Sequence, residues 1–212
     1  MKIKLTYPKI PDALHCPLKS CYAFEKIDGT NIHWVWNSEF GFHDFGTRRD
    51  RFLNSDAGWV QFYQAHPELD GLKEVFRKIE PTLNDFLIQN YYGTEEIIIF
   101  TEFYGANSFA GGHEPKDEKK LTLFDVQING KMLPPDQFIK QFGPFGIPKV
   151  VFQGKFTGQL FVDVRNSKYP VQEGVVVKGM ADGKVYMAKI KTNAYLQKLK
   201  DQFKNNWQEY WE

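Results

Sequence analysis

The sequence predicts an α+β fold with mostly antiparallel sheets. Short runs of β-prone residues, such as residues 32–36, are followed by turn residues and then by a returning apolar run. Segments with apolar residues at helical spacing fill the intervals between these strands. Of the 212 residues, 42% are apolar and 16% are aromatic, which is enough for one substantial domain with a hydrophobic core.

The strands are predicted from apolar or alternating runs that are bounded by turn residues. They are expected at residues 21–25, 32–36, 40–45, 97–103, 121–128, 150–152, 175–178 and 184–190. The polar segments 37–39 and 181–183 and the dipeptide Asn129-Gly130 are the expected turns of three hairpins. Residues 105–120 are glycine-rich and then charged, and we expect a mobile loop there.

The helices are predicted from apolar residues at intervals of three and four. Ser55 can cap a helix that continues to Ala65, and residues 69–79 have the spacing of a second helix. Pro81 is expected to interrupt that helix before a third helix at residues 82–91. Shorter elements are expected at residues 134–141 and 158–165, and a C-terminal helix has an apolar side formed by Leu196, Leu199, Phe203 and Trp207.

Composition excludes several classes of protein. The net charge is only +1, so any surface that binds phosphate must be local. The two cysteines, Cys16 and Cys21, are too few for a disulfide framework, and no Cys/His cluster has zinc spacing. The sequence shows neither a signal peptide nor an apolar run of membrane-spanning length, so we expect an intracellular, cytoplasmic protein that does not bind membranes.

Residues 25–31 read Glu-Lys-Ile-Asp-Gly-Thr-Asn and contain a candidate nucleophile. Lys26 ends an apolar run just before a glycine turn, which is an unusual position for a packing residue. A lysine amine that is held among other cations loses its proton more easily and can attack an electrophile. The alternative is a solvated lysine at the end of a strand, beside an ordinary Asp-Gly turn.

Charged side chains also stand at the ends of other predicted strands, namely Arg48, Arg49, Glu102, Glu173, Lys178, Lys189 and Lys191. Glu102 closes an isoleucine-rich strand, where burial of an unpaired carboxylate would be costly. Lys189 and Lys191 would share one face of a strand and repel each other unless an anion lay between them. Each position taken alone also has a plain structural interpretation, such as a solvated basic loop for the two arginines.

Together and in this order, these positions and Leu123-Phe124-Asp125 resemble the collinear motifs of the covalent nucleotidyltransferases, the superfamily of polynucleotide ligases and mRNA capping enzymes. The resemblance runs from Lys26 to Lys191. It implies the nucleotidyltransferase (ligase adenylation) fold, with two mostly antiparallel sheets and flanking helices around an ATP cleft. It also implies a single adenylyltransferase domain over residues 1–212, with no separate C-terminal or OB domain.

The resemblance implies a role for each matching residue. The implied catalytic residues are the nucleophile Lys26 and Glu173, Lys189 and Lys191, with Glu173 also a candidate ligand of Mg²⁺ or Mn²⁺. The implied ATP-binding residues are Glu25, Ile27, Asn31, Arg48, Glu102, Phe124 and Lys178. Phe124 would stack on adenine, Glu102 would bind a ribose hydroxyl, and Arg48 (with Arg49 as the alternative) would contact a phosphate.

Asn31 directs the functional prediction toward RNA. DNA ligases and capping enzymes usually have arginine at this position, whereas Asn31 is similar to the RNA ligase 2 type. We therefore expect an ATP-dependent RNA ligase that forms lysyl-AMP, passes the AMP to a 5′-phosphate RNA end or nick, and seals it by attack of a 3′-hydroxyl. The alternatives are a small DNA ligase, a capping-type guanylyltransferase, or a non-catalytic adaptor that binds nucleotides or RNA ends.

The C-terminal side of the chain departs from the RNA ligase 2 pattern. Full-length ligases of this type have a separate domain after the last lysine motif, whereas residues 192–212 suffice for one helix. An accessory protein or domain could replace the missing one. The candidate RNA-binding surface then comprises Arg48, Arg49, Arg51, Lys198, Lys200 and Lys204. For the three lysines, a solvated helix face is the better explanation.

Overall fold

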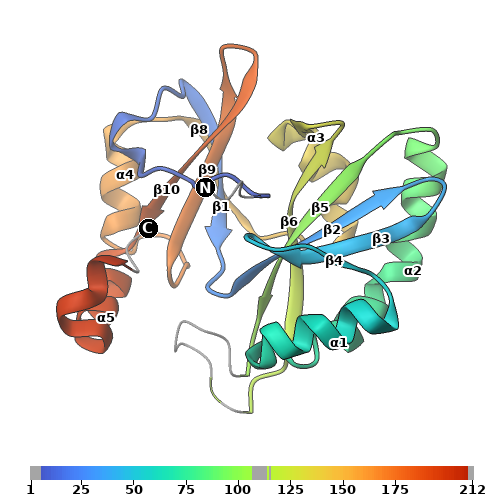
Figure 1. The fold of residues 1–212 in the computed structure, drawn as a ribbon. Coiled ribbons are helices and arrows are strands. Elements are labelled where there is room, and N and C mark those ends of the chain that lie inside the picture. Colours follow the sequence, from blue (N-terminus) through green and yellow to red (C-terminus); the bar gives the residue numbers. More distant parts are fainter. Residues whose placement is uncertain (1–5, 107–113, 115, 210–212) are drawn as a thin grey trace, which may run out of the picture. The chain divides into compact units, whose positions relative to one another are not determined.

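The computed structural model describes residues 6–106, 114 and 116–209. The chain divides into two compact units. The first unit comprises residues 1–8, 28–133 and 137–147, and the second comprises residues 9–27, 134–136 and 148–212. Each unit contains one sheet whose ladders are all antiparallel, accompanied by helices (Figure 1), so the predicted α+β fold class is confirmed.

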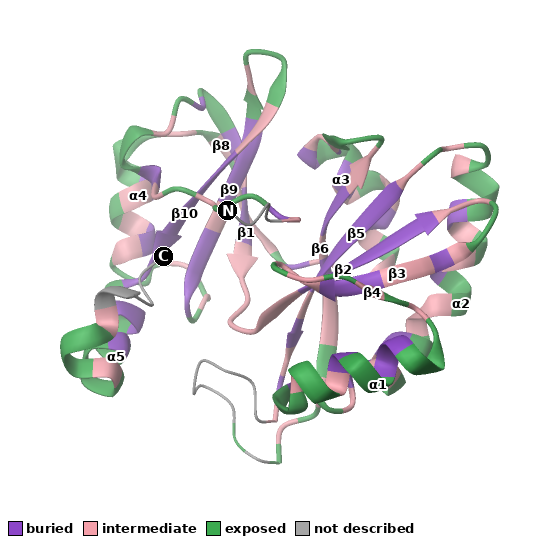
Figure 2. Ribbon diagram, viewed as in Figure 1, coloured by how far each residue is buried: buried purple, intermediate pink, exposed green. Residues whose placement is uncertain are grey.

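The first unit is built on a six-stranded sheet with the order β4-β3-β2-β5-β6-β7. Its strands are β2 (Thr30–Asn37), β3 (Gly41–Thr47), β4 (Phe52–Leu53), β5 (Ile97–Tyr104), β6 (Lys120–Ile128) and β7 (Lys131–Met132). The predicted hairpin of residues 32–45 is formed by β2 and β3, which pair antiparallel. The central strands β2 and β5 are the most buried elements of this unit (Figure 2).

Helices α1 (Asp56–Ala65) and α2 (Leu72–Tyr91) cover one face of this sheet (Figure 1). The Trp34 ring of β2 stacks on Phe76 of α2, with 3.5 Å between ring centroids, and Phe45 of β3 stacks on Trp59 of α1 at 3.9 Å. Side chains alternate along a strand, so the neighbours of Trp34 point to the opposite face of the sheet. Asn31 and His33 are therefore on the face that α1 and α2 do not cover.

The prediction that Pro81 separates two helices was wrong. Residues 72–91 form one α-helix with Pro81 inside it. The buried residues of α2 are Leu72, Phe76, Leu83 and Leu87, which form one apolar stripe that continues across the proline. Proline removes one backbone hydrogen bond and costs about 3 kcal/mol, and burial of this stripe on the sheet exceeds that cost.

Pro81→Ala should therefore stabilise the protein. Pro81 is exposed, so its ring contributes little packing, and alanine would restore the hydrogen bond from residue 81 to the carbonyl of Arg77. We expect the free energy of unfolding to rise by about 1–3 kcal/mol. Urea denaturation of both proteins measures this, and a lower stability of the alanine variant would contradict the stated cost of Pro81.

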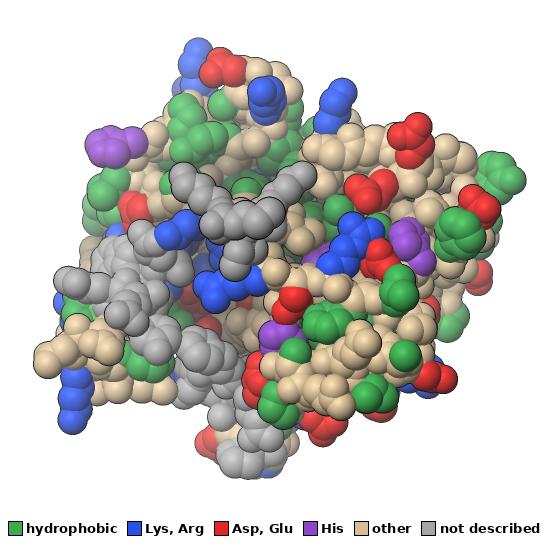
Figure 3. All heavy atoms as spheres, in the orientation of Figure 1, with side chains coloured by type: hydrophobic (Ala, Val, Ile, Leu, Met, Phe, Trp, Pro, Cys, Tyr) green, Lys and Arg blue, Asp and Glu red, His purple; other side chains and the backbone are tan. Residues whose placement is uncertain are grey.

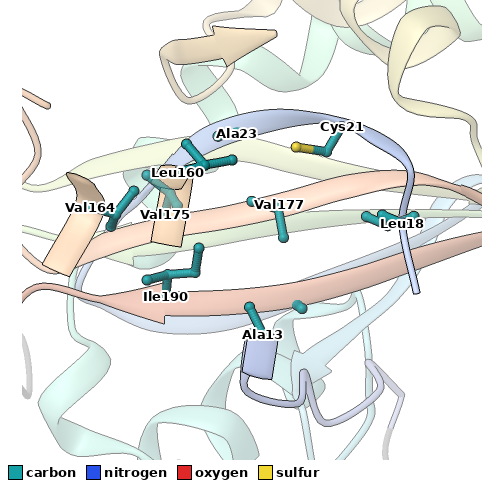
Figure 4. Packing of buried hydrophobic residues seen from close by; sticks show 10 residues of the cluster. Ala13, Leu18, Cys21, Ala23, Leu160, Val164, Val175, Val177 and Ile190 are labelled. Carbon is teal, nitrogen blue, oxygen red and sulfur yellow. The ribbon is translucent and has the colours of Figure 1, made fainter. Parts of the chain in front are cut away.

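The second unit is built on a four-stranded sheet with the order β10-β9-β1-β8. Its strands are β1 (Ser20–Lys26), β8 (Val150–Lys155), β9 (Gly174–Ala181) and β10 (Lys184–Lys191). Helix α4 (Gly158–Arg165) packs Leu160 and Val164 against one face of this sheet (Figure 4). That face carries Ala23, Val175, Val177 and Ile190, and it forms the core of the unit.

The remaining helices are α3 (Pro135–Phe142), α5 (Asn193–Phe203) and the 3₁₀ segments η1 (Ala13–His15), η2 (Pro67–Leu69), η3 (Gly143–Phe145) and η4 (Lys204–Glu209). The predicted C-terminal helix ends earlier than expected. Lys204 has φ 44°, which ends α5, and Trp207 lies in η4 instead of on the apolar side of α5. Residues 107–113 and 115 of the loop predicted to be mobile lie outside the described residues.

Charged side chains of both signs are interspersed over the face seen in Figure 3, in keeping with a net charge of +1. Within the described ranges, no helix combines the length and the apolar character needed to cross a membrane.

Candidate active site

Three rows of side chains cross the face of the second sheet that α4 does not cover. Cross-strand partners point to the same face, and β9 lies between β1 and β10. Lys26 and Lys191 both pair with Gly174, and this row lies at the end of the sheet. Lys189 lies in the next row, with Phe24 and Val176, and Lys178 lies in the third row. The structure thus brings the four predicted lysines onto one face, which we call the lysine face.

Glu173 joins the first row from the residue before β9. Lys26 Nζ donates a hydrogen bond to Glu173 Oε2 at 2.9 Å, and Lys191 Nζ lies 3.3 Å from Oε1. The Glu173 side chain is only 3% exposed, whereas Lys26 is 25% exposed. Each carboxylate oxygen therefore has its own ammonium partner, while the nucleophile candidate stays accessible to solvent.

Gly174 allows the two lysines of this row to flank the same position. Its φ is 153°, and a Cβ added there would lie 2.0 Å from the carbonyl oxygen of Ile190. Only glycine permits so close an approach of β9 and β10. The backbone is held on the other side by Thr192, whose amide donates to Glu173 O at 2.9 Å and whose hydroxyl donates to Gln172 O.

The local field is positive despite Glu173. Burial, the charge of Lys191 and the charge of Lys26 lower the pKa of Lys189 from 10.5 to about 8, and Glu173 and Lys9 change it less. A strongly perturbed lysine on a face with three other lysines is typical of an anion-binding or catalytic site. Lys178 has a different neighbour, because its Nζ lies 5.0 Å from the centroid of the Phe24 ring.

Lys189→Met should raise stability near neutral pH. The Lys189 pKa is about 8 in the folded protein and 10.5 in the unfolded chain. The unfolded state therefore binds more protons between these pH values, and wild-type stability rises across that window. At pH 7 the charged lysine therefore lowers the free energy of unfolding by about 3 kcal/mol relative to pH 10.5. The stabilisation by methionine should approach this value at pH 7 and shrink above pH 8.

Urea denaturation at pH 7 and pH 10 measures this difference. Lys184→Met is the matched control, because Lys184 is exposed at the other end of β10. An equal effect of Lys189→Met at both pH values would show that the Lys189 pKa is not lowered.

The first unit holds a second cluster of predicted residues, on the uncovered face of its sheet. Glu102 of β5 pairs with Asn31 of β2, and the register of β5 and β6 shifts next to Phe124. The Phe124 ring meets Tyr7 edge to face, with 5.2 Å between centroids, and Tyr7 also contacts Phe100 at 4.8 Å. Phe124, predicted to stack on adenine, therefore stands in an aromatic group on this face.

Tyr7 and Asp125 also belong to this cluster, and the sequence alone assigned neither of them a role. The Tyr7 hydroxyl donates to Asp125 Oδ2 at 2.6 Å, and both side chains are buried. Burial, together with the charge of Asp125, keeps the pKa of the Tyr7 phenol well above 10, so the hydroxyl remains a donor. Asp125 could have been singled out in the sequence, because it is a carboxylate inside the apolar run of β6. Nothing in the sequence near Tyr7 indicates that its hydroxyl bonds Asp125.

Arg48 and Arg49 are distinguished by their contacts. Arg48 Nε donates to the carbonyl oxygen of Tyr7 at 3.2 Å, and the amide of Thr6 donates to the Arg48 carbonyl at 3.1 Å. Arg49 is exposed. Arg48 therefore belongs to the Tyr7 cluster, and its contact with a phosphate stays a prediction.

The other predicted residues, which are Glu25, Ile27 and the remaining candidate RNA-binding residues, were not placed in either of the two clusters described above. Glu25 pairs with Val175 and lies on the opposite face of β1 from Lys26, and Ile27 follows the end of β1. Of the candidate RNA-binding residues, Arg51 already pairs with Asp44 at 2.6 Å, and Lys200 Nζ lies 4.9 Å from the centroid of the Trp207 ring. Lys198 and Lys204 are exposed.

A preformed metal cage is not found in the described part of the chain, where no three His, Cys, Asp or Glu side chains are grouped suitably for a metal ion. Glu173 is thus a single carboxylate, paired with lysines. This fits only a metal ion that takes most of its ligands from water and substrate phosphates, as Mg²⁺ commonly does.

Solved structures share this fold. The chain matches an RNA ligase of Naegleria gruberi, in a mutant with AMP and Mn (TM-score 0.64, 17% identity), in a mutant with ATP and Mn (0.61, 17%) and in a structure with PPi (0.59, 16%). In each case the match covers 95% of this chain and 60% of the ligase chain. No curated protein matches the sequence. A family model described as RNA ligase matches residues 19–191, which is most of the sequence, and the chain therefore belongs to the RNA ligase family.

Proposed function

We propose that this chain is an ATP-dependent RNA ligase that seals nicks or RNA ends through a covalent lysyl-AMP at Lys26. The observation that carries the proposal is the first row of the lysine face. An accessible amine stands at a strand end, 2.9 Å from a buried carboxylate, with Lys191 in the same row and Lys189 in the next. Packing alone does not explain three like charges gathered in two neighbouring rows.

The chemistry of the first step follows from these residues. Lys26 Nζ must lose a proton to become a nucleophile, and Glu173 is the base that contacts it. The neutral amine then forms a bond to the α-phosphorus of ATP, and the bond to the bridging oxygen of the β-phosphate breaks. The products are lysyl-AMP and pyrophosphate. Lys189 and Lys191 would stabilise the negative charge on the α-phosphate oxygens.

A divalent metal would add positive charge on the phosphates and orient the leaving pyrophosphate. Glu173 is the candidate protein ligand, and water and the ATP phosphates would supply the other ligands. The Naegleria ligase structures with ATP or AMP and Mn support this choice of cofactors.

The adenosine would be held by residues of the first unit. Phe124 would stack on adenine, Glu102 would accept from a ribose hydroxyl, and Arg48, held by the Tyr7 carbonyl, would contact phosphate. We propose that the two units work together as one adenylyltransferase domain. The chain spans 60% of the length of the Naegleria ligase in the structures named above. We also propose that an accessory protein or domain assists RNA binding.

Incubation with α-labelled ATP and a divalent metal tests the first step. The label should stay on the protein through denaturing electrophoresis, should be released by acid as expected of a phosphoramidate, and should be removed by added pyrophosphate. Labelling with GTP in place of ATP would point instead to a guanylyltransferase. Nicked duplexes with RNA or DNA on the 3′-hydroxyl side then identify the sealing substrate, and a protein that takes no label would contradict the proposal.

A further inference from the structure

His33 is a fully buried residue of β2 that the proposed mechanism does not use. Its neighbours Ile32 and Trp34 point toward α1 and α2, where Trp34 stacks on Phe76, so His33 points to the other face of the sheet. Across the strands it pairs with Phe100 of β5, whose ring contacts Tyr7 and Phe124. His33 is therefore on the face proposed to bind adenosine.

One ring nitrogen of His33 is a fixed donor. His33 Nδ1 lies 2.9 Å from the carbonyl oxygen of Thr47, which can only accept, so Nδ1 carries the proton. Burial lowers the pKa of His33 to about 4, and the ring is neutral at physiological pH. Nε2 therefore presents a lone pair and can only accept a hydrogen bond.

That acceptor lacks a donor. Among the described residues, the two buried side-chain polar atoms without a hydrogen-bond partner are His33 Nε2 and Asn31 Oδ1. They stand two residues apart on the same face of β2, and Asn31 is opposite Glu102. Buried polar atoms are almost always paired, so two neighbouring orphan acceptors indicate that a donor from outside the protein belongs there.

We propose that His33 Nε2 and Asn31 Oδ1 accept hydrogen bonds from donor groups of the bound nucleoside, either the adenine amino group, which would select ATP, or ribose hydroxyls. This inference rests on the proposed function. Two residues along a strand span about 6.8 Å, which is comparable with the length of a purine ring. The Asn31–Glu102 row and the His33–Phe100 row can thus meet different parts of one nucleoside.

The two buried acceptors, His33 Nε2 and Asn31 Oδ1, should favour ligand groups that donate hydrogen bonds and disfavour groups that only accept them. A carbonyl oxygen placed against His33 Nε2 or Asn31 Oδ1 would face a lone pair in a buried environment. If the donor is the adenine amino group, guanine presents an oxygen at that position, and GTP should react roughly a hundredfold less efficiently than ATP.

Nucleotide analogues test the proposal on the wild-type protein. The KM for lysyl-AMP formation is compared for ATP, for its analogue without the 6-amino group, and for 2′-deoxy- and 3′-deoxy-ATP. The analogue that lacks the contacted group should show a KM roughly tenfold higher. Equal KM values for all four nucleotides would overturn the proposal and leave a buried water as the partner of His33.

Two variants assign the effect to His33. His33→Asn keeps a donor toward Thr47 but loses the acceptor, whereas His33→Gln places an amide oxygen near the position of Nε2. His33→Asn should raise the KM for ATP roughly tenfold, and its KM should not rise further with the analogue that lacks the contacted group. His33→Gln should have a KM for ATP close to that of the wild type. If His33→Asn still discriminates against that analogue as the wild type does, the contact belongs to another residue such as Glu102, and the proposal for His33 fails.

The control is His43→Asn, because His43 is a half-buried histidine of β3 that bonds the carbonyl of Gly41. Circular dichroism reports whether each variant folds. If His33→Asn does not fold, the analogue series on the wild type still shows whether a donor group of the nucleoside is contacted. A wild-type protein that forms no lysyl-AMP would contradict the proposed function itself. A wild-type protein that forms it without discriminating among the analogues contradicts only this inference.

Discussion

Lys26→Ala should abolish the covalent AMP adduct while leaving the protein folded. The proposed reacting atom is Lys26 Nζ, and no other described lysine combines a strand-end position with the 2.9 Å contact to Glu173. The loss should be at least about a thousandfold, because the remaining residues can bind ATP but cannot form the phosphoramidate bond. Stability should change little, because Lys26 is 25% exposed and Glu173 keeps Lys191 as a partner.

Labelling with α-labelled ATP measures the adduct, and thermal unfolding monitors the fold. Lys19→Ala is a suitable control, since Lys19 is an exposed lysine just before β1. Lys26→Arg keeps the positive charge and should also take no label, because a guanidinium is a poor nucleophile at neutral pH. Persistent labelling of Lys26→Ala would place the nucleophile at another residue.

The same variant separates the steps of ligation. Attack of a 3′-hydroxyl on an RNA end that already carries AMP does not need a lysine nucleophile, so Lys26→Ala should retain sealing of pre-adenylylated nicked RNA. An adaptor that only binds RNA ends would show no such activity in either protein. This experiment therefore distinguishes the ligase from the adaptor even if the substrate for the first step is not ATP.

Local patterns predicted the longer strands of both sheets because strand alternation and turn residues are local properties, but the two-residue strands β4 and β7 were not predicted. The ends of β1 and β10 were expected close to where the structure has them, whereas β9 continues beyond its predicted end at Lys178 to Ala181. The shared face of Lys189 and Lys191 follows from period two alone. The prediction at Pro81 was wrong because the low helix propensity of proline is a local property. The helix α2 is held together by its apolar stripe, which depends on packing against the sheet.

The cross-strand contacts of the site could not be predicted from the sequence. Register decides that Lys26 and Lys191 share Gly174 as a partner, and that Tyr7 reaches Asp125, 118 residues away. The orphan acceptor of His33 likewise depends on the Thr47 carbonyl, which fixes its tautomer. Sequence motifs identified the charged groups, and register determines which of them meet.

Gly174→Ala should be the most damaging small substitution in the second unit. The added Cβ would lie 2.0 Å from Ile190 O and 2.8 Å from Lys191 Cα, and φ at this position is 153°. Both obstacles are backbone, so β9 and β10 must separate. We expect the free energy of unfolding to fall by about 3 kcal/mol. Lysyl-AMP formation should fall as well, because separation of the strands moves Lys191 away from Glu173.

Gly158→Ala is the matched control for this substitution. Gly158 is exposed at the start of α4, where an added Cβ meets nothing within 4 Å. Alanine there should be neutral or stabilise the protein by up to about 1 kcal/mol, because helix propensity improves. Urea denaturation gives the stability of both variants, and labelling of the folded fraction gives their activity. If Gly174→Ala were as stable and as active as Gly158→Ala, the close approach of β9 and β10 would not be what positions the lysine face.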